Sequence, residues 1–196
     1  MGKIVYLMGK SSSGKDTIYK KLLEQKDIRL EKIVPYTTRP IRAEEQDGVE
    51  YHFTDEAGYQ ELLQKGEVIE ARIYHTCHGI WRYFTVADNT VELSEQSYLT
   101  IGTLEAYEQI RSFYGKDRVI PVMIELDDGI RLQRALDREM AQEHPKYEEM
   151  CRRFLADAED FSSERMAAAD IAQTFHNDDL NQCLTKIIEY LKECGA

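Results

Sequence analysis

Residues 9–17 read Gly-Lys-Ser-Ser-Ser-Gly-Lys-Asp-Thr and directly follow an apolar run, Ile-Val-Tyr-Leu-Met, at residues 4–8. The run predicts a strand buried on both faces, the two glycines bound a loop, and the residues after Gly14 predict the start of a helix. The spacing of Gly9, Gly14 and Lys15 matches the G-x-x-x-x-G-K pattern, in which backbone N–H groups and a helix N-terminus surround a polyphosphate. We therefore expect a phosphate-binding loop in a strand–loop–helix unit.

The side chains of this loop have separate expected roles. Lys15 would reach the outer phosphates as a mobile positive charge. The next residue is commonly Ser or Thr, whose hydroxyl ligates Mg²⁺, but here it is Asp16, followed by Thr17. Because a carboxylate also ligates Mg²⁺, Asp16 and Thr17 are the candidate metal ligands. The residues expected to contact the phosphates are Gly9, Lys10, Ser11, Ser12, Ser13, Gly14, Lys15, Asp16 and Thr17.

The length and composition indicate one globular domain. The chain has 196 residues, of which 42% are hydrophobic and 31% are charged, values that are ordinary for a soluble globular protein. Residues 1–10 have no signal-peptide pattern, and no apolar run approaches the ~18 residues that span a bilayer. The four cysteines are scattered, without the paired spacing of a zinc site, so we expect reduced thiols and a cytoplasmic location.

The charge is acidic overall but basic around the loop. A formal net charge of −11 argues against nucleic acids or anionic membranes as partners. Residues 1–42 nevertheless carry ten Lys and Arg against four Asp and Glu. A basic segment around a phosphate-binding loop predicts a small anionic ligand.

Strand and helix patterns alternate along most of the chain, which predicts a three-layer α/β fold with a parallel central sheet. Residues 36–88 differ, because they carry much of the aromatic content and short β-like runs, and we expect them to form a mixed insertion outside the main sheet. The expected strands of the main sheet are 3–8, 30–36, 97–101, 119–126 and 169–175. The expected helices are 14–25, 55–65, 104–114, 129–141, 147–162 and a C-terminal helix capped by Asp178 or Asp179.

A second group of candidate residues lies in residues 35–53, which read P-Y-T-T-R-P-I-R-A-E-E-Q-D-G-V-E-Y-H-F. Arg39 and Arg42 are three residues apart, and a turn at Asp47-Gly48 would bring Tyr51 back toward them. Two guanidinium groups and a phenol that converge suit a phosphate monoester, which has several acceptor oxygens. The alternative is two surface arginines and a packed tyrosine.

The phosphate loop, the T-T-R-x-x-R motif at residues 37–42 and the G-x-x-Y-x-F motif at residues 48–53 resemble the guanylate kinase family of nucleoside monophosphate kinases. The resemblance covers nearly the whole chain. It implies a three-layer P-loop kinase fold with a parallel central sheet, a mixed acceptor-binding insertion and a helical lid. The implied parts are a core (residues 1–35, 89–127 and 165–196), an acceptor-binding subdomain (residues 36–88) and a lid (about 128–164).

The resemblance also implies roles for single residues. Glu70 is similar to the family's Glu that recognises the guanine edge. Arg134, Arg138 and Arg153 fall where lid arginines embrace the transferred phosphates, and Asn177 opens an N-D-D-L segment near the donor nucleotide. The implied catalytic residues are Lys15, Arg138 and Arg153; Arg134 and Asn177 join the loop in binding ATP; and Arg39, Arg42, Tyr51, Glu70 and His78 bind the acceptor.

Four positions depart from the family's pattern. Pro35 replaces a Ser that contacts the acceptor, and the segment H-T-C-H-G after Glu70 places His78 at the position of a phosphate-binding Tyr. Gly102 stands where an acidic residue helps to read guanine, and Asp16 replaces the hydroxyl residue of the loop. We hypothesise that Asp16 supplies the carboxylate that the metal needs.

The resemblance implies an enzyme that uses ATP and Mg²⁺ to phosphorylate a nucleoside monophosphate, GMP or dGMP first of all. Its partners would be small-molecule nucleotides, and it would act as a monomer or a homodimer. One alternative is the same chemistry on another phosphorylated acceptor, because the G-K-D-T loop and the H-G-I segment also resemble ribose 1,5-bisphosphate phosphokinases. The other is a guanylate-kinase-like module that binds phosphopeptides without catalysis, which the intact Gly9, Gly14 and Lys15 argue against.

Overall fold

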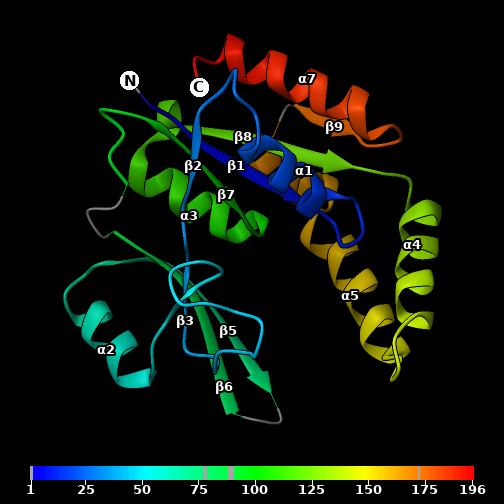
Figure 1. Ribbon diagram of the computed structural model, residues 1–196, viewed down its shortest axis with the longest axis horizontal. Helices are drawn as coiled ribbons and strands as arrows, with labels where there is room; N and C mark the ends of the chain where they lie inside the picture. The colour runs from blue at the N-terminus through cyan, green and yellow to red at the C-terminus, as the bar shows by residue number, and fades with distance from the viewer. Residues whose placement is uncertain (1, 77–78, 88–90, 172) are drawn as a thin grey trace.

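The first apolar run forms the central strand of a parallel sheet. The computed structural model describes residues 2–76, 79–87, 91–171 and 173–196. β1 (Ile4–Gly9) pairs with β7 (Ser97–Ile101) on one side and with β8 (Val119–Glu125) on the other. β2 (Leu30–Lys32) and β9 (Thr174–His176) complete the order β2-β7-β1-β8-β9, and every pairing in this sheet is parallel (Figure 1).

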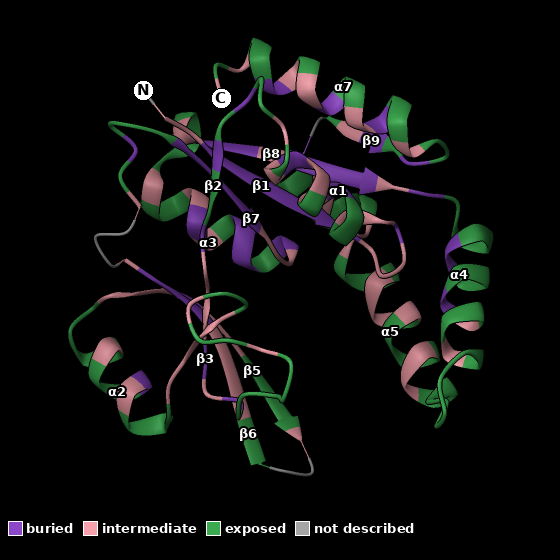
Figure 2. Cartoon of the chain, viewed as in Figure 1, coloured by how far each residue is buried: buried purple, intermediate pink, exposed green. Residues whose placement is uncertain are grey.

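Helices cover both faces of this sheet, because successive side chains of a strand point to opposite faces. α3 (Leu104–Tyr114) covers one face, and α1 (Lys15–Leu23) and α7 (Leu180–Glu193) cover the other. Figure 2 shows the buried residues concentrated in these layers. The side chains of β1 divide between two core clusters: Ile4, Tyr6 and Met8 lie with α3, and Val5 and Leu7 lie with α1 and α7.

A second sheet of four strands lies outside the first. Its order is β4-β3-β6-β5, and its strands are β3 (Tyr36–Thr37), β4 (His52–Phe53), β5 (Val68–Thr76) and β6 (Gly79–Val86). β3 pairs with β4 in parallel, and the other two pairings are antiparallel. The second sheet is therefore mixed, as expected for this region. α2 (Glu56–Gln64) follows β4 and begins at an Asp55 cap.

The predicted strand 30–36 is wrong in one respect, since it is two strands in two sheets. β2 ends at Lys32, and β3 begins at Tyr36. Pro35 has no N–H to give to a ladder, which favours the change of sheet at this point, and its carbonyl accepts a hydrogen bond from the His52 N–H at 2.9 Å.

The predicted strand 169–175 is also wrong in extent. A short helix that the sequence did not predict, α6 (Ser163–Ala168), lies just before it and is capped by the side chain of Ser162. Ala169 and Ile171 then pack into the core beneath α3, and among residues 169–171 and 173–176, which the structure describes, those of β9 pair with the sheet. Apolar periodicity alone does not separate such a buried connection from a strand.

Two further helices project from the main sheet. α4 (Asp128–Met140) and α5 (Tyr147–Asp160) lie side by side, apart from α2 and the second sheet (Figure 1). A one-turn helix, η1 (Lys116–Arg118), precedes β8. None of the helices that the structure describes is long and apolar enough to span a membrane.

Candidate active site

The loop between β1 and α1 is held by a residue from the far end of the chain. Gly14 has a left-handed backbone, with φ of 89°, and a Cβ at this position would lie 2.3 Å from the Asn177 Nδ2 atom. That amide nitrogen is buried and donates to the Ser13 carbonyl at 2.7 Å. Glycine is therefore required at residue 14 both for the left-handed backbone and for the close approach of Asn177. The family resemblance had placed Asn177 at this site.

The loop leaves buried polar atoms that a ligand would satisfy. Among the residues that the structure describes, three buried side-chain atoms have no hydrogen-bond partner: Ser12 Oγ, Ser13 Oγ and Asn177 Oδ1. Buried polar atoms in proteins are almost always paired. All three belong to the loop or to the residue that holds it. The first N–H groups of α1, which have no partner within the helix, begin at the same place, so the site suits the oxygens of a polyphosphate.

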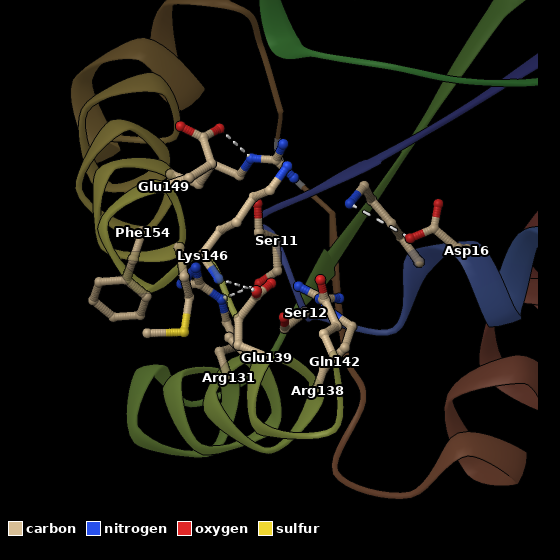
Figure 3. Close-up of a pocket in the computed structure, with 14 residues that line it drawn as sticks. Ser11, Ser12, Asp16, Arg131, Arg138, Glu139, Gln142, Lys146, Glu149 and Phe154 are labelled. Atoms are coloured by element: carbon tan, nitrogen blue, oxygen red, sulfur yellow. Dashed lines mark hydrogen bonds and ion pairs between the residues drawn. The ribbon is translucent and has the colours of Figure 1, made fainter. Parts of the chain in front are cut away.

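Cationic side chains from the loop and from both projecting helices line one cavity. This cavity, of about 350 Å³, lies between the loop and α4–α5, and Lys15, Arg138 and Arg153 are in its lining. Figure 3 labels Arg138 together with Ser11 and Ser12 of the loop. Arg138 and Arg153 are both exposed. Arg134 lies at the edge of the loop, with its Nη1 atom 3.9 Å from a Cβ built at Gly14. The structure thus brings the predicted catalytic residues together.

A carboxylate that the sequence reasoning missed accompanies these arginines. Glu149 accepts from Arg153 Nε at 2.7 Å and from Arg152 Nε at 2.7 Å. The hydrogen bond from Arg152 is the largest influence on the pKa of Glu149, and with the bond from Arg153 it lowers that pKa to about 2. The i, i+4 spacing of Glu149 and Arg153 on one helix is a signal that predicts this pair.

On the second sheet, Arg39 is buried in a polar network. Its guanidinium binds both oxygens of Glu45, at 2.7 and 2.9 Å, and its Nε atom donates to the Tyr83 hydroxyl at 3.1 Å. The guanidinium carbon lies 5.5 Å from the centre of the Tyr51 ring. The hydrogen bond from Arg39 is the largest influence that lowers the pKa of Glu45, to about 2. Glu45 and Tyr83 were not among the predicted site residues.

Arg42 lies next to this network but faces solvent. Its side chain is exposed, while its backbone N–H donates to the Glu45 carboxylate at 2.9 Å. The Tyr51 ring stacks edge-on against Tyr83 at 5.5 Å. The structure therefore places Arg39, Arg42 and Tyr51 close to Glu45, with Arg39 buried, Tyr51 partly buried and Arg42 exposed.

The expected guanine-recognition residue is buried and engaged. The Glu70 carboxylate, 2% exposed, accepts from Arg72 Nε and Nη2 at 3.2 and 3.3 Å and from the Thr85 hydroxyl at 2.7 Å. Arg72 and Thr85 were missed, because Thr85 reaches Glu70 only through the β5–β6 pairing. His78, predicted to contact the acceptor, lies outside the described residues.

The whole chain matches a known family. The family description that matches residues 1–194 is "Guanylate kinase". The chain belongs to the guanylate kinase family. The guanylate kinase of Vibrio cholerae serotype O1 is 35% identical over 113 residues, which are 57% of this chain and 53% of that protein. That of Clostridioides difficile is 41% identical over 80 residues, which are 40% of this chain and 38% of that protein. The chain spans about half the length, or less, of these curated relatives.

A solved structure shares the fold. The crystal structure of guanylate kinase from Anaplasma phagocytophilum superimposes with a TM-score of 0.62 and covers 98% of this chain and 85% of that chain, at 22% sequence identity. The predicted P-loop kinase fold with a parallel central sheet is confirmed.

In this guanylate kinase family member, a tyrosine fills the space beside Gly102. A Cβ built at Gly102 would lie 2.1 Å from the Tyr6 hydroxyl oxygen. That hydroxyl donates to the Thr103 carbonyl at 3.2 Å, and burial raises the pKa of Tyr6 above its usual range. Because Tyr6 occupies this space, the acid expected at residue 102 does not fit.

The loop also offers oxygen ligands for a metal. Asp16 is 81% exposed in its side chain, with the Lys15 ammonium 3.9 Å away, and Thr17 is exposed. No group of three or more His, Cys, Asp and Glu that could hold a metal occurs in the described part of the chain. Mg²⁺ bound with a nucleotide needs only one or two protein oxygens, since phosphates and water supply the rest. Asp16, which lines the cavity, fits that requirement, whereas Thr17 is not among the lining residues.

Proposed function

We propose that this chain is an ATP-dependent kinase that phosphorylates a nucleoside monophosphate, with GMP or dGMP as the acceptor. The observation that supports this most is the single cavity in which the phosphate loop meets Lys15, Arg138 and Arg153. A fixed loop, a mobile cation and two lid arginines supply the positioning and charge neutralisation on which phosphoryl transfer depends.

On the donor side, the loop from Gly9 to Thr17 would bind the triphosphate, and Lys15 would contact its outer oxygens. Asp16, with Thr17, would hold Mg²⁺, which when bound neutralises charge on the β- and γ-phosphates. Asn177 would keep the loop in shape through its hydrogen bond to the Ser13 carbonyl.

On the acceptor side, the buried Arg39 network would orient Arg42 and Tyr51 toward the acceptor phosphate. That phosphate is already ionised, so its oxygen attacks the γ-phosphoryl group without a general base. Arg138 and Arg153 would approach as negative charge develops, and closure of α4 and α5 as a lid would exclude water and suppress hydrolysis of ATP. We further propose that residues 36–88 form the acceptor-binding subdomain and residues 128–164, approximately, the lid.

One observation favours a second candidate, which is the same transfer to another phosphorylated acceptor. Guanine offers N–H donors, which a free carboxylate would accept. Here both oxygens of Glu70 accept from Arg72, and Tyr6 fills the space of the second acid. The Arg72 guanidinium lines a cavity together with Thr103, and it would suit an additional anionic group such as the second phosphate of ribose 1,5-bisphosphate.

A coupled assay of ADP release with a panel of acceptors tests both candidates. GMP, dGMP, AMP, UMP and ribose 1,5-bisphosphate would be offered in turn with ATP and Mg²⁺. Activity with GMP or dGMP above the others supports the first candidate, and activity with ribose 1,5-bisphosphate alone replaces it with the second. Lys15→Met, expected to lose about two to three orders of magnitude in turnover, is the control that ties the signal to this loop. Absence of transfer to every acceptor, together with failure to bind any Mg²⁺-nucleotide in calorimetry, would favour a non-catalytic module.

We place the enzyme in the cytoplasm, acting on small-molecule nucleotides as a monomer or a homodimer. The acidic net charge, −11, supports partners other than nucleic acids and anionic membranes.

A further inference from the structure

Arg131 is a buried charged residue that the proposed mechanism does not use. It lies in the first turn of α4 and is 1% exposed. Its guanidinium donates to Asp128 at 2.6 Å, to Asp157 of α5 at 3.0 Å and to the Ser11 carbonyl at 3.0 Å. The guanidinium carbon also lies 4.9 Å from the centre of the Phe154 ring. One side chain thus connects α4, α5 and the phosphate loop.

The contacts hold both polar backbone groups of Ser11. The Ser11 N–H donates to Asp157 Oδ2 at 2.8 Å, and the Ser11 carbonyl accepts from Arg131 Nε. The same Asp157 oxygen accepts from Arg131 Nη2. Arg131 and Asp157 therefore form a clamp on Ser11, and each also balances the charge of the other (Figure 3 labels Arg131 and Ser11).

The residue after the clamp has an unfavourable backbone conformation. Ser12 has a φ of 63°, in the left-handed region that costs free energy for any residue with a Cβ. The Ser11 carbonyl belongs to the planar peptide group that joins Ser11 to Ser12. The hydrogen bond from Arg131 therefore fixes this peptide plane, and the Ser12 φ is the rotation about the N–Cα bond that follows it. Without the clamp, Ser12 would relax toward a negative φ, and the amides after it would turn away from the ligand.

We propose that Arg131, with Asp157, is a positioning residue that keeps Ser12 left-handed and so preorganises the phosphate loop for ATP. The proposal rests on the proposed function in taking ATP as the ligand of the loop. Three facts carry it: the burial of Arg131, the two hydrogen bonds on Ser11, and the strained residue that follows. Arg131 also lines the cavity, but its guanidinium donors go to the Ser11 carbonyl, Asp128 and Asp157, so its proposed role acts through the loop backbone. A buried ion pair adds little to stability compared with apolar replacements, so a role in fixing one conformation accounts for its presence better than stability does.

The test combines loss of the clamp with relief of the strain. Arg131→Met and Asp157→Leu remove the clamp, and Ser12→Gly removes the conformational cost. Because each clamp variant leaves a charge without its partner, Arg131→Met/Asp157→Leu serves as a further variant in which the buried pair is replaced by apolar groups. Arg165→Met, which removes the exposed ion pair with Asp160, is the matched control.

Calorimetry with ATP and Mg²⁺ gives Kd, and circular dichroism with thermal unfolding confirms that each variant folds. The clamp variants are expected to bind ATP about tenfold more weakly, while the Arg165 control binds as the wild type does. Because Ser12→Gly also removes the Ser12 hydroxyl, Kd is compared within the Ser12→Gly background, where loss of the clamp is expected to weaken ATP binding much less than it does in the wild type. A folded clamp variant with unchanged Kd would overturn the proposal, and so would a loss of the same size in the Ser12→Gly background, since a merely structural role predicts no such difference.

Hydrogen exchange of residues 9–17, measured by mass spectrometry without nucleotide, separates this proposal from the proposed function. If the wild type binds no ATP, the proposed function fails, but faster exchange in the loop of the clamp variants alone still supports the clamp. Equal exchange in the clamp variants and the Arg165 control would overturn it.

Discussion

Arg72 donates to both carboxylate oxygens of Glu70, at 3.2 and 3.3 Å, and so occupies the group that the family resemblance assigns to guanine recognition. The buried Glu70 carboxylate accepts these two hydrogen bonds and a third from Thr85. Most of its capacity to accept hydrogen bonds is therefore already used. On the proposed function, the choice of acceptor would depend on whether Arg72 stays bound to Glu70 when the acceptor enters.

Arg72→Met is expected to raise kcat/KM for GMP relative to UMP by about tenfold or more, because a freed carboxylate accepts the N–H donors of guanine. The variant should also lose about 3 kcal/mol of unfolding free energy, since Glu70 stays buried without its partner, so rates are measured well below its Tm. Lys65→Met, which removes an exposed ion pair with Glu61 on α2, is the control and should leave the ratio unchanged. An unchanged ratio in Arg72→Met would mean that Glu70 does not select the acceptor.

The contact between Gly102 and Tyr6 predicts a strong coupling in stability. Gly102→Ala should cost about 2 kcal/mol of unfolding free energy in the wild type, because the new Cβ would lie 2.1 Å from the Tyr6 hydroxyl. In a Tyr6→Phe background the nearest ring atom is 3.1 Å away, and the cost should fall by more than half. Urea unfolding of the four proteins measures the coupling. Additive effects would show that the backbone at residue 102 moves away freely.

Asp16 is expected to determine how tightly the loop holds Mg²⁺ with ATP. Replacing a charged oxygen ligand with a neutral one weakens the metal site, so Asp16→Ser should need about tenfold more Mg²⁺ for half-maximal activity. Asp27→Ser, which removes an exposed carboxylate in an ion pair with Lys192, is the control. A Mg²⁺ titration of Asp16→Ser that overlays the wild type would end the hypothesis that Asp16 is a ligand.

The strand–loop–helix unit around Gly14 could be predicted from sequence because its determinants are contiguous. One strand, one loop and one helix start carry the motif, and Gly14 needs its special conformation for a local reason. Asn177 lies far along the chain, and only the family resemblance linked it to the loop. Its buried hydrogen bond to the Ser13 carbonyl supplies the physical reason.

The partners of the charged residues could not be predicted, because tertiary packing brings them together. Arg131 reaches Ser11 across 120 positions of sequence and Asp157 across 26, and no periodic pattern marks such pairs. The Glu45 partner of Arg39 is only six residues away, but the irregular chain between them gives no spacing rule of the kind that a helix provides. Likewise, Tyr6 reads as an ordinary member of an apolar strand until the position of Gly102 is known.

The Arg39–Glu45 pair predicts how acid affects the acceptor side. The folded pKa of Glu45, about 2, lies below its usual value of 4.5 because Arg39 stabilises the charged form. The stability that the pair contributes is therefore fully present above about pH 5 and is lost as the pH falls toward 2. We expect the difference in unfolding free energy between wild type and Glu45→Gln to stay constant from pH 7 to about pH 5 and to shrink below that, as measured by urea unfolding at each pH. Glu61→Gln, at an exposed i, i+4 pair with Lys65, should differ little from the wild type at any pH. A Glu45→Gln difference that grows as the pH falls would show that the carboxylate is not held in its charged form by Arg39.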